Sequence, residues 1–135
     1  MIKQIRQQLI ADIKDTLGFG TVDKYRGEFE EGSDWNPSHS ACFLRVMNYR
    51  SRVRAADGRG IRKSVVIKVY AGSNFRHGKD ALDMIEGLIN MLDGSTLEGE
   101  YLAGKKYNMI VGEEGMDMIL YERGFEGYAF DLIVT

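Results

Sequence analysis

The stretch VVIKVYAGSNFRHGKDALDMIEGLINMLDG, residues 65–94, changes its hydrophobic period half-way along. In residues 65–70 every second position is apolar, which is typical of a strand with one buried face. Residues 78–93 instead place apolar side chains three and four positions apart, which indicates an amphipathic helix. That apolar face consists of Ala81, Leu82, Ile85, Leu88, Ile89 and Leu92. The sequence therefore predicts a strand and then a helix, with Ser73 or Asn74 near the helix N-cap.

The same two periods recur on both sides of this unit. The N-terminus carries one helical stripe, formed by Ile2, Ile5, Leu9, Ile13 and Leu17. Alternating patterns predict strands near residues 41–49, 107–111, 116–120 and 128–134, and residues 21–29 add a possible edge strand. Glycine-containing turns at 112–115 and 122–127 favour antiparallel neighbours. We therefore predict an α+β fold in the order helix, strands, helix, strands: a mainly antiparallel sheet of about five to six strands, with two helices packed on one face.

Composition places the chain among ordinary globular proteins. It has 135 residues, 44% hydrophobic and 28% charged, which suits a single domain over residues 1–135. No apolar run approaches the roughly 18 residues that span a bilayer, and the first residues lack the features of a signal peptide. The one cysteine, Cys42, can form no internal disulfide and lies in a strand pattern, so a buried structural role is expected. These features predict synthesis in a reducing cytoplasm and no membrane partner.

Two stretches resemble ligand-binding loops but lack the residues that the chemistry needs. Residues 71–80, AGSNFRHGKD, occupy the position of a phosphate-binding loop. Gly72 and Gly78 are one residue too far apart, however, and an aspartate stands where the loop needs a hydroxyl for Mg²⁺. Residues 33–39 lack the glycine and the glutamate of a calcium loop, and the two histidines are isolated. The sequence thus predicts no catalytic, cofactor-binding or metal site, and a protein that is not an enzyme.

The methionines and the only tryptophan have other expected roles. Met109, Met116 and Met118 fall on strand alternation, so we expect them to fill the core. Trp35 stands in a polar, acidic loop, where it either packs over the edge of the sheet or contacts a partner.

Charge is distributed unevenly although the formal net charge is only −2. Residues 45–68 hold eight of the 18 basic residues and one acid, whereas residues 80–135 hold twelve of the 20 acids and three bases. The basic residues are centred on a predicted hairpin arm at about 50–63, with a turn signal at Asp57-Gly58. They are Arg50, Arg52, Arg54, Arg59, Arg62 and Lys63. So many cations cannot be buried unpaired, so the arm is expected to project from the core.

Three interpretations of this arm are open. It is a solvated hairpin whose charge prevents edge pairing, a phosphate-binding element for nucleic acid, or a segment that docks on an acidic protein surface. The absence of an aromatic residue between Arg50 and Lys63 and an isoelectric point of about 5.7 count against nucleic acid. The acidic loop proposed as a docking surface contains Glu28, Glu30, Glu31 and Asp34, with Trp35 beside them.

Several segments resemble a known family. VDKYRGEFEE at 22–31, following an amphipathic helix and preceding the short strand SACFLRV at 40–46, resembles the Mu-like phage tail protein family. The run at 65–94 and the closing FEGYAFDLIVT at 125–135 are similar to that family's strand-turn-helix and its aromatic last strand. The tripeptide GEF at 27–29 is the most recognisable motif, and the resemblance spans nearly the whole chain. Family members are related in fold to the tail terminator proteins of long-tailed phages.

This resemblance implies a structural role without catalysis or cofactor. Tail terminators assemble as six-membered rings on the end of the tail tube, stop its polymerisation and offer a surface to the head. The expected partners are other copies of the chain, the tail tube protein and a head-joining protein, with DNA only passing through the lumen. The expected location is the host cytoplasm during assembly and then the virion tail. A neck or tail-completion protein of the same fold and a small nucleic-acid-binding module remain alternatives.

Overall fold

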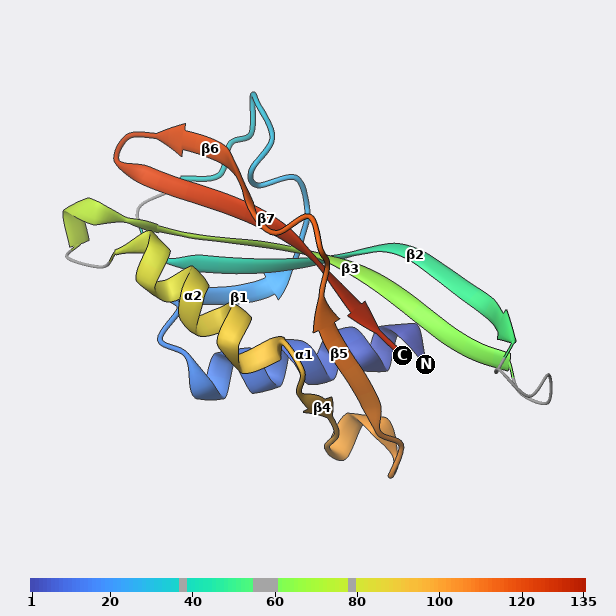
Figure 1. Ribbon diagram of the computed structural model, residues 1–135. Coiled ribbons are helices and arrows are strands. Elements are labelled where there is room, and N and C mark those ends of the chain that lie inside the picture. The colour runs from blue at the N-terminus through green and yellow to red at the C-terminus, as the bar shows by residue number, and fades with distance from the viewer. Residues whose placement is uncertain (37–38, 55–60, 78–79) are drawn as a thin grey trace.

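The structure of the protein is a computed structural model. It describes residues 1–36, 39–54, 61–77 and 80–135, with the backbone alone for residues 50–54, 61–63 and 77. The elements are α1 (Ile2–Thr16), β1 (Thr21–Lys24), β2 (Ala41–Arg54), β3 (Ile61–Asn74), the 3₁₀ helix η1 (Phe75–His77), α2 (Ala81–Leu92), β4 (Thr96–Leu97), the 3₁₀ helix η2 (Glu100–Leu102), β5 (Tyr107–Val111), β6 (Asp117–Glu122) and β7 (Phe125–Val134). The predicted α+β class and the order helix, strands, helix, strands are confirmed (Figure 1).

The strands form one curled sheet in the order β1-β2-β3-β7-β5-β4, and β6 also pairs with β7. All pairs are antiparallel except β1 with β2, which is parallel. A parallel pair needs a long connection, and residues 25–40 supply it. β5 and β6 share one edge of β7: β5 pairs with its last residues and β6 with its first. As a result, β6 stands at an edge of the sheet.

Side chains from both helices meet alternate residues of the central strands in one core. Its buried members include Ile5, Leu9 and Ile13 from α1, Ile85, Leu88 and Leu92 from α2, Cys42 and Leu44 from β2, Val65, Ile67 and Val69 from β3, and Tyr128, Phe130, Leu132 and Val134 from β7. The period-two and helical patterns therefore identified most of the main core. The prediction was wrong for Leu82, which was placed on the apolar face of α2 and is 47% exposed. In the described part of the chain, no helix has the length and apolarity needed to cross a membrane.

A smaller aromatic cluster covers part of the opposite face of the sheet. Its buried members are Phe29, Ala41, Phe43, Tyr70, Phe125 and Ala129. Those from β2, β3 and β7 alternate with residues of the main core, so they point to the other side. Phe29 is the centre: its ring lies 5.4 to 5.9 Å, between centroids, from the rings of Trp35, Phe43, Tyr70 and Phe125.

A pair of glycines allows this close packing. Gly72 of β3 and Gly127 of β7 lie directly opposite each other in the ladder. A Cβ on Gly127 would overlap the ring of Phe29, and a Cβ on Gly72 would overlap the carbonyl oxygen of Glu126 and the ring of Phe125. Glycine at these two positions therefore leaves the room that the rings of Phe29 and Phe125 occupy above the two strands.

The start of α2 differs from the prediction. Ser73 and Asn74 continue the pairing of β3 with β7, and η1 follows them. The N-cap is Asp80, whose carboxylate accepts a hydrogen bond of 2.9 Å from the backbone N–H of Leu82. The prediction of Ser73 or Asn74 near the cap was wrong because the strand runs further than its hydrophobic alternation indicates.

The methionines of the β6 region also differ from the prediction. Met109 is buried as expected, but Met116 and Met118 are 37% and 52% exposed. Alternation alone suggested a core role for them. That prediction was wrong because β6, in the described part of the chain, has β7 as its only strand neighbour and presents nearly all of its side chains to solvent.

Gly87 lies inside α2 without a steric reason for being glycine. The nearest atom to a Cβ placed there is Cδ2 of Leu17, at an ordinary contact distance of 3.8 Å. Because glycine costs about 1 kcal/mol relative to alanine inside a helix, Gly87→Ala is expected to raise the free energy of unfolding by about 0.5–1 kcal/mol. Urea denaturation followed by circular dichroism measures this, and a lower midpoint would show that the added methyl group displaces a neighbour.

Candidate interaction surface

β2 and β3 continue beyond the sheet as a two-stranded ribbon. β1 pairs with β2 only as far as Leu44, and β7 pairs with β3 only from Val65 onward. In the part of the chain that the structure describes, residues 50–54 of β2 and 61–64 of β3 pair only with each other, and this ribbon projects from the body of the protein (Figure 1). Two register shifts interrupt the pairing of β2 along this part.

The predicted basic arm coincides with the outer part of this ribbon. The side chains of Arg50, Arg52, Arg54, Arg59, Arg62 and Lys63, and the turn at Asp57-Gly58, lie outside the described residues. Nearer the body, Met47 and Tyr49 of β2, at the base of the ribbon, are 47% and 37% exposed. The base of the ribbon thus adds apolar surface beside the basic sequence.

The acidic loop predicted as a docking surface folds over the aromatic cluster. Phe29 anchors it from below, and the half-buried Trp35 packs its ring 5.6 Å from that of Phe43 and 5.1 Å from that of Phe125. Of the two roles considered for Trp35, packing over the sheet is therefore the one observed. The carboxylates of Glu30, Glu31 and Asp34 are on exposed residues, and Glu28 accepts a hydrogen bond from the backbone N–H of Arg26.

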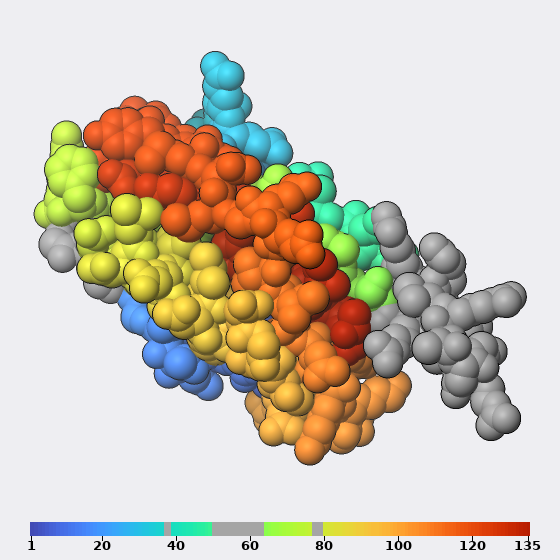
Figure 2. All heavy atoms as spheres, in the orientation of Figure 1, coloured from blue at the N-terminus to red at the C-terminus, as the bar shows by residue number. Residues whose placement is uncertain are grey.

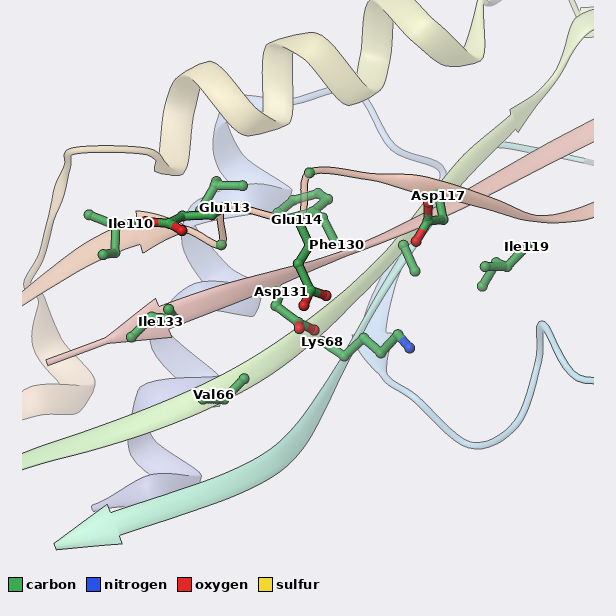
Figure 3. A pocket seen from close by; sticks show the side chains of 14 residues that line it. Val66, Lys68, Ile110, Glu113, Glu114, Asp117, Ile119, Phe130, Asp131 and Ile133 are labelled. Atoms are coloured by element: carbon green, nitrogen blue, oxygen red, sulfur yellow. The ribbon is translucent and has the colours of Figure 1, made fainter. Parts of the chain in front are cut away.

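A groove of about 480 Å³ opens on the same outer face of the sheet, next to β6 (Figure 3). Val66 and Lys68 of β3 lie opposite Ile133 and Asp131 of β7 and form its floor. These residues alternate with core residues, so the strand period itself turns them outward. The turn between β5 and β6 forms a wall.

The groove is mainly acidic, and its floor combines apolar and charged residues. Its carboxylates are Glu113, Glu114, Asp117 and Asp131, its apolar residues include Val66, Ile110, Ile119 and Ile133, and Lys68 is its one basic residue. Glu114 and Asp131 lie beside each other near the middle of the groove, above Lys68 (Figure 3). Within the described residues, none of the four carboxylates makes an ion pair. The groove therefore presents carboxylates whose charge is not neutralised by a basic side chain at contact distance.

A second hollow of about 400 Å³ lies on the other side of β6. It is lined by Glu28, Glu30, Glu31 and Glu122, together with Phe29, Trp35 and the residues 119–121. Ile119 lines both hollows. The strand β6 is therefore flanked by acidic side chains on both sides.

Exposed apolar side chains gather on the same segment. Of the eleven large hydrophobic side chains exposed in the described part of the chain, five lie within residues 110–121. They are Ile110, Met116, Met118, Ile119 and Tyr121, the last of which is 64% exposed. In Figure 2 this segment, in orange, runs along the outer surface next to the yellow α2. Apolar residues that cluster in this way, with a polar rim, are typical of an interaction site.

Sequence reasoning found the acidic loop but missed the groove. The surplus of acids in residues 80–135 was visible, and solvated surface is the default interpretation of such residues. Which of them meet depends on the pairing of β7 with three other strands, which brings Asp131 beside the turn of Glu113 and Glu114. Single-residue alternation does not contain that information.

In the described part of the chain, the other reactive groups do not form a site of their own. Cys42 is fully buried in β2, and burial raises the pKa of its thiol well above the usual value. Tyr25 stacks on Tyr70 with ring centroids 3.8 Å apart, and partial burial raises the pKa of Tyr25 to about 12. Among the residues that the structure describes, no group of three or more His, Cys, Asp or Glu side chains is arranged to hold a metal ion.

No protein-family model and no curated protein matches this chain. The resemblance to the Mu-like phage tail proteins therefore rests on the segments quoted above. What the structure adds is a surface with defined chemistry: an open strand, an acidic groove and a projecting ribbon.

Proposed function

We propose that the protein is a structural subunit of a phage or prophage tail, a tail terminator that closes with copies of itself into a six-membered ring on the tail tube. The observation that carries this proposal is β6, an edge strand with exposed apolar side chains between two acidic hollows. The ring ends tube polymerisation and presents a surface to a head-joining protein. Assembly takes place in the host cytoplasm, and the finished ring belongs to the virion tail.

The exposed edge of β6 is the first argument that this surface binds another protein. Natural proteins protect exposed strand edges with lysine, proline or a covering element. The sequence of β6, DMILYE, contains neither lysine nor proline. A register shift between Met118 and Leu120 and the charges of Asp117 and Glu122 protect this edge only in part. The exposed apolar side chains between those charges are a liability in a monomer but a contact in an assembly.

The distribution of charge is the argument that this partner is a second copy of the same chain. A basic ribbon and an acidic surface on one chain are complementary but different patches, so they favour a head-to-tail contact between identical copies. Head-to-tail contacts form closed rings when the rotation permits. The number six comes from the resemblance to tail terminators.

Blocking the edge of β6 tests this function. Met118→Lys with Ile119→Lys places two charges on exposed positions of the strand, 52% and 40% exposed, so the fold should survive while the contact is lost. We expect the unchanged protein to form rings of six times the 15.3 kDa chain mass, seen by native mass spectrometry and electron microscopy, and the variant to remain monomeric.

Leu82→Lys, at a position 47% exposed on α2, is the control and should still form rings. Rings of the unchanged protein should also weaken as salt rises from about 0.1 M to about 1 M, because the screening length falls from about 10 Å to about 3 Å. A chain that stays monomeric at high concentration, and also when mixed with tail tubes, contradicts the proposed function.

A further inference from the structure

We propose that the basic ribbon of one copy lies in the acidic groove beside β6 of the next copy. In this contact the ribbon supplies the basic residues and the groove supplies the carboxylates that accept their hydrogen bonds. This inference rests on the proposed ring function and specifies which two surfaces of the chain meet. It also replaces the acidic loop, predicted from sequence, with a different acceptor.

The ribbon needs a partner for physical reasons. Two strands without a third neighbour and without a packed face are marginally stable in water. Residues 50–54 of β2 and 61–64 of β3 have in the described part of the chain only each other as strand neighbours. The exposed Met47 and Tyr49 at its base provide apolar contact area for a covering surface. A ribbon of this length is therefore best explained by a protein surface that covers it.

The ribbon cannot reach the groove of its own chain. Lys68, on the groove floor, and Ile61, near the ribbon tip, belong to the same strand β3. Seven residues of extended strand separate them, which places the two backbone positions about 23 Å apart. Because the ribbon runs away from the groove along this strand, the acceptor must be on another molecule.

The chemistry of the groove matches arginine. Guanidinium groups pair with carboxylates through two parallel hydrogen bonds, and their planar faces and aliphatic stems pack on apolar surface. The groove offers Glu114, Asp117 and Asp131 without ion-pair partners in the described residues, over Val66 and Ile133. An arginine-rich strand lying there would satisfy the carboxylates and cover Val66 and Ile133 in the same contact.

The acidic loop is the weaker acceptor. Glu28 already accepts a hydrogen bond from the backbone of Arg26, and Glu30 and Glu31 are exposed, whereas Asp131 in the groove is half-buried. Glu114 and Asp117 are as exposed as the loop carboxylates, but a strand docked over the half-buried Asp131 would exclude water from this carboxylate and strengthen its ion pair. The contact is therefore assigned to the groove.

Charge reversal on each side tests the contact. Arg52→Glu with Arg54→Glu reverses the ribbon, and Glu114→Lys with Asp117→Lys reverses the exposed part of the groove. Each variant alone is expected to weaken ring formation about tenfold or more, measured by sedimentation velocity over a range of concentrations. The control is Asp15→Lys with Glu86→Lys, which makes the same charge change as the groove variant on exposed positions of the helices and should leave the rings intact.

Restoring the rings by combining the two reversals is a more stringent test than losing them. A chain with both reversals carries an acidic ribbon and a basic groove, so its copies should form rings again. An equal mixture of the two single-sided variants should also form rings, in which the two kinds of copy alternate, because a ring of six accepts alternation. Circular dichroism of every variant establishes that the fold is retained.

The outcomes separate the two proposals. If the unchanged protein forms rings and the groove reversal does not weaken them, the assignment of the groove is wrong and the ring function stands. Failure of the doubly reversed chain to restore rings that each reversal abolishes also overturns the assignment. If the unchanged protein does not associate at any concentration or on tail tubes, the ring function itself is wrong. If the ribbon reversal abolishes binding to DNA while the rings persist, the ribbon is a nucleic-acid contact.

Discussion

Phe29→Ala is expected to lower the free energy of unfolding by about 3–5 kcal/mol, the cost of removing a large aromatic ring from a packed core. Phe29 is 5% exposed, and its ring contacts four other aromatic rings. No other side chain of residues 25–36 is buried to this extent. Its removal would therefore leave a cavity and release the acidic loop from the outer face of the sheet.

Two measurements distinguish the two parts of this effect. Urea denaturation followed by circular dichroism gives the loss of stability. Trp35 is the only tryptophan of the chain and lies against Phe29, so a shift of its fluorescence to longer wavelength reports release of the loop. Phe75→Ala is the matched control, because Phe75 is 55% exposed and its loss should cost much less. Equal losses at the two positions would contradict the central role of Phe29.

Gly72→Ala is expected to destabilise the protein by about 1–3 kcal/mol or more, although it adds only one methyl group. The added Cβ would overlap a backbone atom, the carbonyl oxygen of Glu126, as well as the ring of Phe125. A ring at the end of a side chain can rotate, but the carbonyl belongs to the ladder between β3 and β7. Relief therefore requires the two central strands to separate locally.

Gly87→Ala is the matched control for this substitution. The chemical change is identical, but the Cβ at Gly87 meets only ordinary contacts, so the two variants should change stability in opposite directions. The same denaturation experiment measures both. A Gly72→Ala protein as stable as the unchanged one would show that β3 and β7 are not held at the spacing described.

Hydrophobic period alone was sufficient to predict most elements of the fold. Most residues of the stripes of α1 and α2 and of the alternation in β2, β3, β5 and β7 are buried in one core or packed against it, with Leu82 the exposed exception on α2. The parallel pairing of β1 with β2 was not predictable, because alternation is the same in both orientations. The exposure of Met116 and Met118 was not predictable either, since it depends on which strands neighbour β6.

The candidate site was predicted less completely than the fold. The sequence indicated a basic hairpin and an acidic loop, because both are continuous runs of charge. The groove is assembled from β3, β7 and the turn that carries Glu113 and Glu114, which are far apart in the sequence. The outer aromatic cluster was missed for a related reason: Phe29 comes from a loop, and its partners occupy the strand positions that face away from the main core.

The continuity of β3 has a mechanical consequence. One strand runs from Ile61 in the ribbon, through Lys68 on the groove floor, to Asn74 before η1. The two register shifts in its pairing with β2 fall between residues 46 and 53 of β2. A load applied at the tip would be carried along this single backbone into the middle of the sheet. Because β3 is paired with β7 from Val65 onward, a force on the outer end of β3 would act on the same ladder hydrogen bonds that hold Lys68 in the groove floor.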